Sequence, residues 1–533
     1  TIAKESKYLV NDDAIIRNLE SKGCNVIYAT YKVCTDDIDY FMKNGTVLVD
    51  CIISLKGFCL NYGDQEQGVE YLKKYNVPVI KAVKDSSQPP SQFNESARGL
   101  GLISVPSEVI QPEIDGCIEY IWTAGYVKDP VSQQYYYEPL MSQVDWLCDR
   151  AVSWANLRRA DNADKKISIL YYNHEGGKND IGASYLDISS SFTLLLERMR
   201  EDGYNIGNGS IPNGSELIDL FIESRNVGAW APEELEKVVA SGNVTLVFVE
   251  DYLSWYNTLP ESIRSDVEAT WGKPPGEIMV HNGQFVIPTV QFGNVNFIPQ
   301  PTKAWLSDES LIYHNKSIPP THQYLATYFW INNVYDSDAI IHFGTHGTQE
   351  WFAGKEVGLS RYDYSSIMVA DTPVIYPYIM DNVGEGTQAK RRGNAVIIDH
   401  LTPPIIEAGI YGDLAAMHEK MHNFGESMSA NDTAMMALYR SSIIELYKNL
   451  SLQNDLSLTP DELIEMNDQE FADFIGNDVH NYLHELGTTL MPYGVHIFGV
   501  APEDEKLVCM VKSMLRSDFV DHVYDMIPKE GGD

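Results

Sequence analysis

Long apolar runs are missing from this sequence of 533 residues. No stretch reaches the roughly 18 apolar residues that a membrane-spanning helix needs. The first residues, TIAKESKYLVNDD, lack the basic and then apolar pattern of a secretory signal. Hydrophobic residues make up 44% of the chain, which is typical of a globular protein with a buried core. We therefore expect a globular protein without a membrane span.

Cysteine is scarce, and no two cysteines form a CxxC pair. The seven cysteines are odd in number and irregularly spaced. This pattern favours reduced, mostly buried thiols over a disulfide framework. We expect a cytoplasmic location.

Positive charge is also in short supply. The chain has 39 Lys and Arg against 75 Asp and Glu, which gives a net charge of −36. Nucleic acid is not expected as a partner, because phosphate binding needs a basic surface. High solubility is the simplest explanation of the acidity, and a few local cations would still suffice to bind a small anion.

No GxxxxGK(S/T) motif, the phosphate-binding loop of many ATPases, occurs in the chain. The loop NHEGGKND at residues 173–180 resembles a phosphate cradle but lacks that spacing. We therefore expect that this chain does not itself hydrolyse ATP.

Alternating helical and strand patterns indicate an α/β protein. Helical patterns cover residues 13–20, 67–74, 140–157, 191–202 and 325–334, and strand patterns cover residues 25–30, 46–54, 77–82, 167–172 and 243–250. Continuous apolar strands separated by helices predict parallel sheets covered on both faces. The expected fold class is multidomain α/β, with several Rossmann- or flavodoxin-like units and a helical carboxy-terminal part.

Shifts in composition divide the chain into five expected segments. They are an α/β amino-terminal domain at 1–125, a helical bridge at 126–164, a second α/β domain at 165–265, a core segment rich in Pro, Gly and aromatic residues at 266–412, and a mostly helical region at 413–533.

The stretch DAIIHFGTHGTQEWFAGKEVG at residues 338–358 is the strongest candidate site. Residues 339–341 predict a buried strand, and a turn rich in glycine then presents His342, His346 and Glu350. Ligands of open α/β sheets bind at the carboxyl ends of strands. Imidazole and carboxylate groups suit a divalent metal or general-base catalysis near neutral pH. A structural turn whose histidines bind backbone carbonyls is the alternative, and spacing alone does not decide.

A compact set of cations accompanies this stretch. Lys355 lies within it, and Lys390, Arg391 and Arg392 follow in GEGTQAKRRG, where Glu385 is expected in a turn. Arginine binds carboxylates through two parallel hydrogen bonds. A solvated helix face is the alternative, but the neighbouring turn favours a binding site.

Residues 418–422 read HEKMH, which matches the HExxH motif of zinc peptidases. The third histidine of one peptidase subgroup would fall at position 428, which is Met428. The flanking sequence offers no other third ligand. An exposed helix with mixed charges is therefore the favoured interpretation, and a zinc hydrolase is the alternative.

Six segments together resemble the large subunits of class I metal chelatases, namely the CobN-type cobaltochelatase subunit and the magnesium chelatase H subunit. They are YYNHEGGKNDIGASYLD, WGKPPGE, VQFGNVNFIPQP, YHNKSIPPTHQYLA, DAIIHFGTHGTQEWFAGKEVGLS and YPYIMDNVGEGTQAKRRGNAVIIDHLTPP. The resemblance covers residues 165–412 and extends to residues 1–125. Family members run further, so we expect an amino-terminal portion of a longer protein or a short homologue.

The resemblance implies a ligase-type enzyme that binds a tetrapyrrole and inserts a divalent metal ion, while partner AAA+ ATPase subunits hydrolyse ATP. TQAKRRG and VIIDHLTPP are closer to the cobalt branch, which implies a corrin precursor and cobalamin biosynthesis. A magnesium chelatase H-type subunit acting on protoporphyrin is one alternative. A non-catalytic tetrapyrrole- or metal-binding module is another.

The resemblance also suggests roles for the candidate residues. We expect His342, His346 and Glu350 to hold the metal or to accept the two protons that leave the macrocycle nitrogens. The expected substrate-binding residues are Lys355, Lys390, Arg391, Arg392 and His174.

Overall fold

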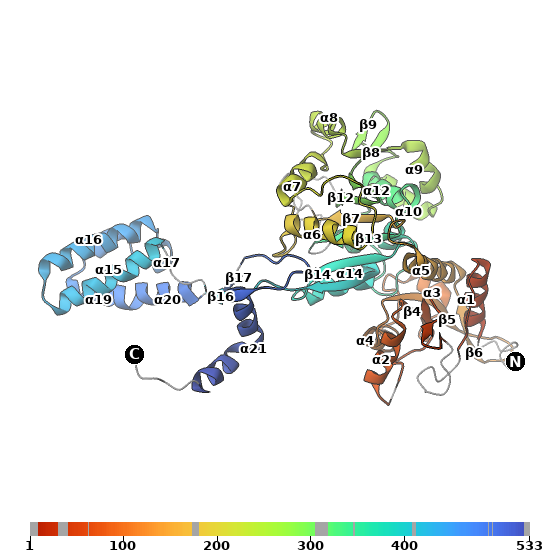
Figure 1. The fold of residues 1–533 in the computed structure, drawn as a ribbon, viewed down its shortest axis with the longest axis horizontal. Helices are drawn as coiled ribbons and strands as arrows, with labels where there is room; N and C mark the ends of the chain where they lie inside the picture. The colour runs from red at the N-terminus through yellow and green to blue at the C-terminus, as the bar shows by residue number, and fades with distance from the viewer. Residues whose placement is uncertain are drawn as a thin grey trace. The chain divides into compact units, whose positions relative to one another are not determined.

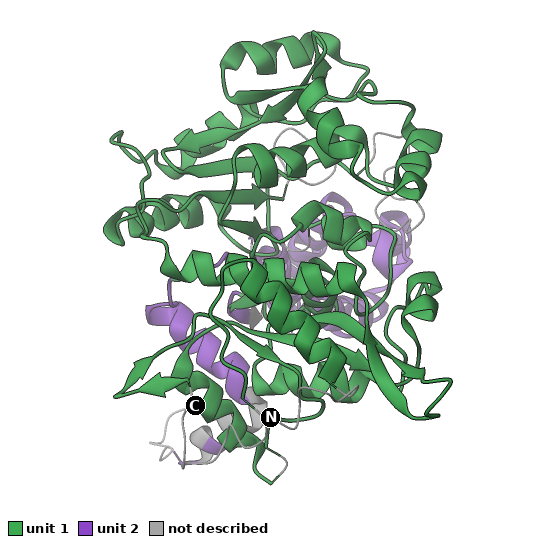
Figure 2. Cartoon of the chain, turned by 90° about the vertical axis from the view of Figure 1, so that its right-hand side faces the viewer, with its two compact units in different colours: residues 1–402, 497–499 green, residues 403–496, 500–533 purple. Residues whose placement is uncertain are grey.

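A computed structural model describes most of the chain, namely residues 9–29, 41–61, 63–172, 181–303, 318–344, 347–407, 412–488, 490–492 and 494–526. The chain forms two compact units (Figure 2). The first comprises residues 1–402 and 497–499, and the second comprises residues 403–496 and 500–533. Among the described residues, no helix is long and apolar enough to cross a membrane.

A six-stranded sheet organises the first unit (Figure 1). Its strands, in spatial order, are β11 (Val290–Phe292), β12 (Val295–Pro299), β7 (Ile167–Tyr171), β13 (Ala339–Phe343), β14 (Val374–Ile379) and β15 (Ala395–His400). All neighbours pair in parallel except β11, which is antiparallel to β12. Numbered along the chain, the five parallel strands lie in the order 2-1-3-4-5, which is flavodoxin-like. The predicted α/β class is confirmed.

Helices cover both faces of this sheet. Helices α6 (Ile188–Glu201) and α7 (Gly214–Glu223) pack on one face, where Phe192 contacts Phe297 and Phe343. Helices α12 (His322–Phe329), α13 (Tyr364–Val369) and α14 (Val383–Gly393) contribute to the core on the other face, with Leu170 and Ile340. Burial on both faces explains why the strands read as continuous apolar runs.

A four-stranded sheet lies nearer the amino terminus. Its order is β3 (Ile52–Ser54), β4 (Val79–Asp85), β5 (Glu119–Lys128) and β6 (Tyr135–Pro139), and only β6 is antiparallel. The associated helices are α1 (Val10–Ser21), α2 (Gln65–Tyr75), α3 (Pro90–Glu95), α4 (Gln111–Asp115) and α5 (Met141–Arg159). A fully buried ion pair ties α5 to the sheet, with Arg150 Nη2 2.7 Å from Glu119 Oε1.

Three strand predictions need correction. Residues 25–29 form no strand, and the predicted strand at 46–54 is divided into β2 (Thr46–Val47), paired with β1 (Met42–Lys43), and β3. Leu48 is half exposed, so this apolar run is not a continuous buried strand. The strand predicted at 243–250 exists as β8 (Val244–Phe248), but it pairs antiparallel with β10 (Gln284–Pro288).

Strand β10 also pairs with β9 (Val280–His281), which makes a separate three-stranded sheet beside helices α8 (Pro232–Ser241), α9 (Val249–Tyr256) and α10 (Glu261–Trp271). The six-stranded sheet joins β7 to strands from beyond residue 265. The domain boundary predicted at 265 is therefore not a boundary of that sheet, and the five-segment division stays a prediction.

The second unit is mainly helical, as predicted. Its helices are α15 (Gly412–Ser429), α16 (Thr433–Asn449), α17 (Gln453–Leu456), α18 (Pro460–Glu465), α19 (Asp468–Phe474), α20 (His480–Thr488) and α21 (Asp504–Met526). Strands β16 (Ile405–Glu407) and β17 (Leu490–Pro492) form an antiparallel pair. Met417, Phe424, Ile443 and Phe471 share the helical core.

Candidate functional site

The candidate site lies where the strand order of the six-stranded sheet reverses. Strands β7 and β13 are neighbours there, and Tyr171 pairs with Phe343 at their carboxyl ends. Ligands of open α/β sheets bind at this kind of position. His174 follows β7 and His346 follows β13 in the sequence, but both fall outside the described residues. Their roles stay predictions.

His342 is part of β13 and does not lie in the turn that the sequence predicts. It is 2% exposed, and its ring stacks on Tyr376 with centroids 5.2 Å apart. Its Nε2 lies 3.2 Å from Tyr328 Oη. Burial lowers the pKa of His342 to about 3, so its imidazole is neutral at physiological pH. A neutral ring can bind a metal ion or exchange hydrogen bonds without adding charge.

Glu350 lies in a short 3₁₀ turn, Gln349–Trp351, and is completely buried. Its Oε1 accepts hydrogen bonds from Gly347 N at 3.0 Å and from Tyr376 Oη at 3.4 Å. Its Oε2 is buried and has no hydrogen-bond partner among the described residues. Burial raises the pKa of Glu350 to about 7. The carboxyl group can therefore gain or lose a proton near neutral pH, and one of its oxygens is available.

Arg392, on α14, holds the chain around Glu350 and is 5% exposed. Its guanidinium donates to the carbonyl oxygens of Glu350 at 2.9 Å, Phe352 at 2.6 Å and Lys355 at 3.1 Å. The Lys355 ammonium in turn donates to the carbonyl of Ser96 at 2.6 Å. Lys355 and Arg392 thus both have backbone partners, and it is Arg392 that positions the Glu350 turn.

Lys390 and Arg391 are only partly buried. The Arg391 guanidinium forms an ion pair with Glu113, at 2.9 Å, and this hydrogen bond raises the pKa of Arg391. The turn predicted around Glu385 is wrong, because α14 includes Glu385 and its flanking glycines. Lys390 and Arg391 are therefore the members of the cationic set that lie nearest to solvent.

The sequence did not reveal the two tyrosines beside His342. Tyr376 comes from β14 and Tyr328 from α12, and both are buried. The only sequence signal is their position in strongly apolar elements, which predicts burial but not the contact with His342.

Gly347 packs tightly against His342, Tyr376 and Gln300. A Cβ atom there would lie 3.1 Å from His342 Nδ1, 3.1 Å from Tyr376 Oη and 3.2 Å from Gln300 Oε1. We expect Gly347→Ala to lower the free energy of unfolding by about 1–2 kcal/mol, because buried neighbours must move apart. Chemical denaturation measures this loss. In the control Gly384→Ala, where no atom lies within 4 Å of the new Cβ, stability should be unchanged or slightly higher. Equal effects of the two changes would contradict tight packing at Gly347.

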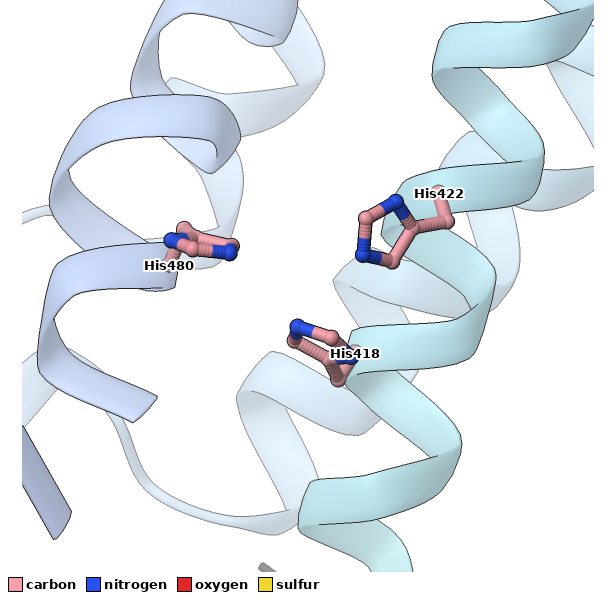
Figure 3. Close-up of side chains that lie close together, drawn as sticks. All are labelled: His418, His422 and His480. Atoms are coloured by element: carbon pink, nitrogen blue, oxygen red, sulfur yellow. The ribbon is translucent and has the colours of Figure 1, made fainter. Parts of the chain in front are cut away.

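The HEKMH motif lies on α15 in the second unit, with Glu419 and His422 exposed. The structure supplies a third histidine, which the HEKMH motif and its flanking residues lack. His480, the first residue of α20, faces His418 and His422 (Figure 3). Burial and the two neighbouring imidazoles lower the pKa of His418. The motif is therefore part of a cluster of three histidines and not only an exposed helix face.

Comparison with known proteins gives one consistent family. A family model described as CobN/Magnesium Chelatase matches residues 3–529. The chain is 34% identical over 494 residues to an uncharacterized protein of Methanocaldococcus jannaschii, covering 90% of this chain and 39% of that protein. It is 31% identical over 540 residues to the chloroplastic magnesium-chelatase subunit ChlH of Oryza sativa subsp. indica, covering 97% of this chain and 37% of that protein.

A solved structure shares the fold. The catalytic subunit of cobaltochelatase from Mycobacterium tuberculosis superimposes with a TM-score of 0.79 at 28% identity, covering 95% of this chain and 42% of that one. The chain thus spans about two fifths of the length of these proteins.

Proposed function

The chain belongs to the CobN/magnesium chelatase family, and from this premise we propose that it forms the tetrapyrrole-binding part of a metal chelatase large subunit. In the proposed reaction a divalent metal ion enters the macrocycle, two ring N–H bonds break, and two protons leave. The metal is a substrate of this ligase-type reaction. Partner AAA+ ATPase subunits would supply ATP hydrolysis.

The carboxyl group of Glu350 carries this proposal. Proton acceptors work best when their pKa lies near the working pH, and burial brings the pKa of Glu350 to about 7. Its unpartnered Oε2 offers a site for a ring proton or for the incoming metal ion. Neutral His342 would support the same step as a hydrogen-bonding partner or metal ligand, and His346 stays a proposed third member.

The cations would divide between two roles. Lys390 and Arg391, partly exposed on α14, would bind the peripheral carboxylates of the macrocycle. Arg392 would act as a positioning residue through the backbone of the Glu350 turn, and Lys355 would hold its own segment against Ser96. His174 stays a proposed substrate contact.

Cobalt is the metal that we favour. Imidazole ligands suit cobalt better than magnesium, which prefers oxygen ligands. A corrin precursor, and hence cobalamin biosynthesis in the cytoplasm, would follow. Magnesium insertion into protoporphyrin is the main alternative, because relatives carry both names. A non-catalytic binding module is the second alternative.

Titration of the chain with a metal-free corrinoid and with protoporphyrin tests the proposal. We expect saturable binding of the corrinoid, detected by absorbance and by fluorescence quenching. Lys390→Ala combined with Arg391→Ala should weaken binding about tenfold or more, because charge-assisted hydrogen bonds contribute about 1.5–3 kcal/mol. In the control Lys237→Ala, which removes a surface cation, affinity should not change. Binding of neither tetrapyrrole would overturn the proposal, and binding of protoporphyrin alone would favour magnesium.

A further inference from the structure

We propose that His418, His422 and His480 form a second metal site, which binds a divalent transition-metal ion of the zinc, cobalt and nickel group. This site lies wholly within the helical unit. It shares no residue with the Glu350 site, so the proposal does not depend on the chelatase function.

The geometry of the three rings carries the proposal. One ring nitrogen from each histidine lies within 4.8 Å of the other two. The ring centroid of His418 lies 4.6 Å from that of His422 and 5.4 Å from that of His480. Figure 3 shows the His480 ring directed from one helix toward the two rings on the other. Zinc–nitrogen bonds of about 2.0–2.1 Å require nitrogens about 3.4 Å apart, so the rings need to approach by no more than about 1.5 Å.

The helices that carry these rings are fixed by the core. Each histidine directly follows a buried residue, namely Met417, Met421 and Val479. All three buried residues belong to the same hydrophobic core. Packing of these residues therefore holds the backbone positions of the three histidines near one another.

Ligand chemistry selects the kind of metal. Three neutral imidazoles favour zinc, cobalt, nickel or copper over magnesium and calcium, which prefer oxygen. Three protein ligands also leave the fourth tetrahedral position for water or another ligand, whereas structural zinc sites usually have four protein ligands.

A pocket of about 800 Å³ lies beside two of the three histidines. His422 and His480 line it together with Phe424, Ile475 and Glu426. A metal-bound ligand therefore has room beside the histidines, and the Glu426 carboxylate lies in the same pocket. The site thus has the features of an exchangeable metal centre.

Cobalt titration of the tag-free chain tests the proposal. Cobalt in a tetrahedral imidazole site gives visible absorption bands, and we expect one equivalent that zinc displaces and magnesium does not. His418→Ala and His480→Ala should each lower the affinity at least about 100-fold, since even loss of an outer-sphere contact costs 10- to 100-fold. Zinc should raise the thermal midpoint of the original chain and not that of His480→Ala.

Matched variants keep the test decisive. His484→Ala removes a histidine one turn further along α20 that lies outside the cluster, and it should retain the cobalt bands. His480→Gln preserves most of the side-chain volume and should still lose them, which separates ligand loss from unfolding. No stoichiometric binding, or binding that survives His418→Ala and His480→Ala but disappears in Glu350→Gln, would overturn the proposal.

Discussion

Under the proposed function, Glu350→Gln should strongly slow metal insertion while leaving tetrapyrrole affinity within about threefold. Glutamine keeps the size of the side chain but cannot take up a proton, and general-base groups contribute about 10²- to 10⁴-fold to a rate. We expect insertion to slow at least 100-fold. The measurement is cobalt insertion into a metal-free corrinoid in the presence of the proposed ATPase partner subunits, alongside tetrapyrrole titration of the same protein.

Glu356→Gln is the matched control, because Glu356 is close in sequence but its side chain is 71% exposed. It should retain both activities. Loss of tetrapyrrole affinity in Glu350→Gln, with the insertion rate of bound substrate unchanged, would instead assign Glu350 to substrate binding.

The same variant has a second readout, the dependence of stability on pH. The pKa of Glu350 rises from the ordinary value of 4.5 to about 7 in the folded chain. Between these values the folded state holds a proton that the unfolded state has released. The free energy of unfolding should therefore fall as pH rises from 4.5 through 7, by up to about 3 kcal/mol.

Glutamine does not titrate, so Glu350→Gln should lack this fall and gain stability relative to the original chain above pH 7. Urea unfolding at pH 5 and pH 8 measures the difference. A stability difference that is the same at both pH values would show that the pKa of Glu350 is not raised.

Apolar patterns predicted many of the helices and strands, because the pattern of an element is contained in its own residues. The apolar run before His342 identifies strand β13, and continuous runs separated by helices identify a parallel sheet. The pairing partner of a strand is not local, which is why the antiparallel pairing of β8 with β10 was not predicted. His480 was missed for the same reason, since motif spacing describes α15 alone and the third histidine comes from α20.

The candidate site also combines features that local sequence predicts with features that only long-range contacts decide. Sequence motifs suggested His342 and Glu350 as site residues. Burial decides their protonation, and burial depends on residues from other elements such as Tyr376. Positive charge and the neighbouring glycine-rich stretch suggested that four cations form one binding patch. The structure separates two cations with backbone partners from two that are partly exposed, and only long-range contacts distinguish them.

Arg392→Lys tests this separation and is expected to destabilise the first unit by about 1–3 kcal/mol. Lysine cannot reproduce the guanidinium fork, so at least one of three buried carbonyls should lose its donor, at about 1–3 kcal/mol each. Chemical denaturation measures the loss. Insertion should also slow, because the carbonyl of Glu350 itself is one of the three acceptors.

Arg391→Lys is the control within the same helix, because its ion pair with Glu113 is partly exposed and should contribute about 1 kcal/mol or less. The two variants should therefore act on different quantities. Arg392→Lys should change stability and insertion rate while the folded protein keeps its tetrapyrrole affinity, whereas Arg391→Lys should change affinity with little loss of stability. The reverse result would place Arg392 on the substrate and would make the backbone contacts around Glu350 secondary to macrocycle binding.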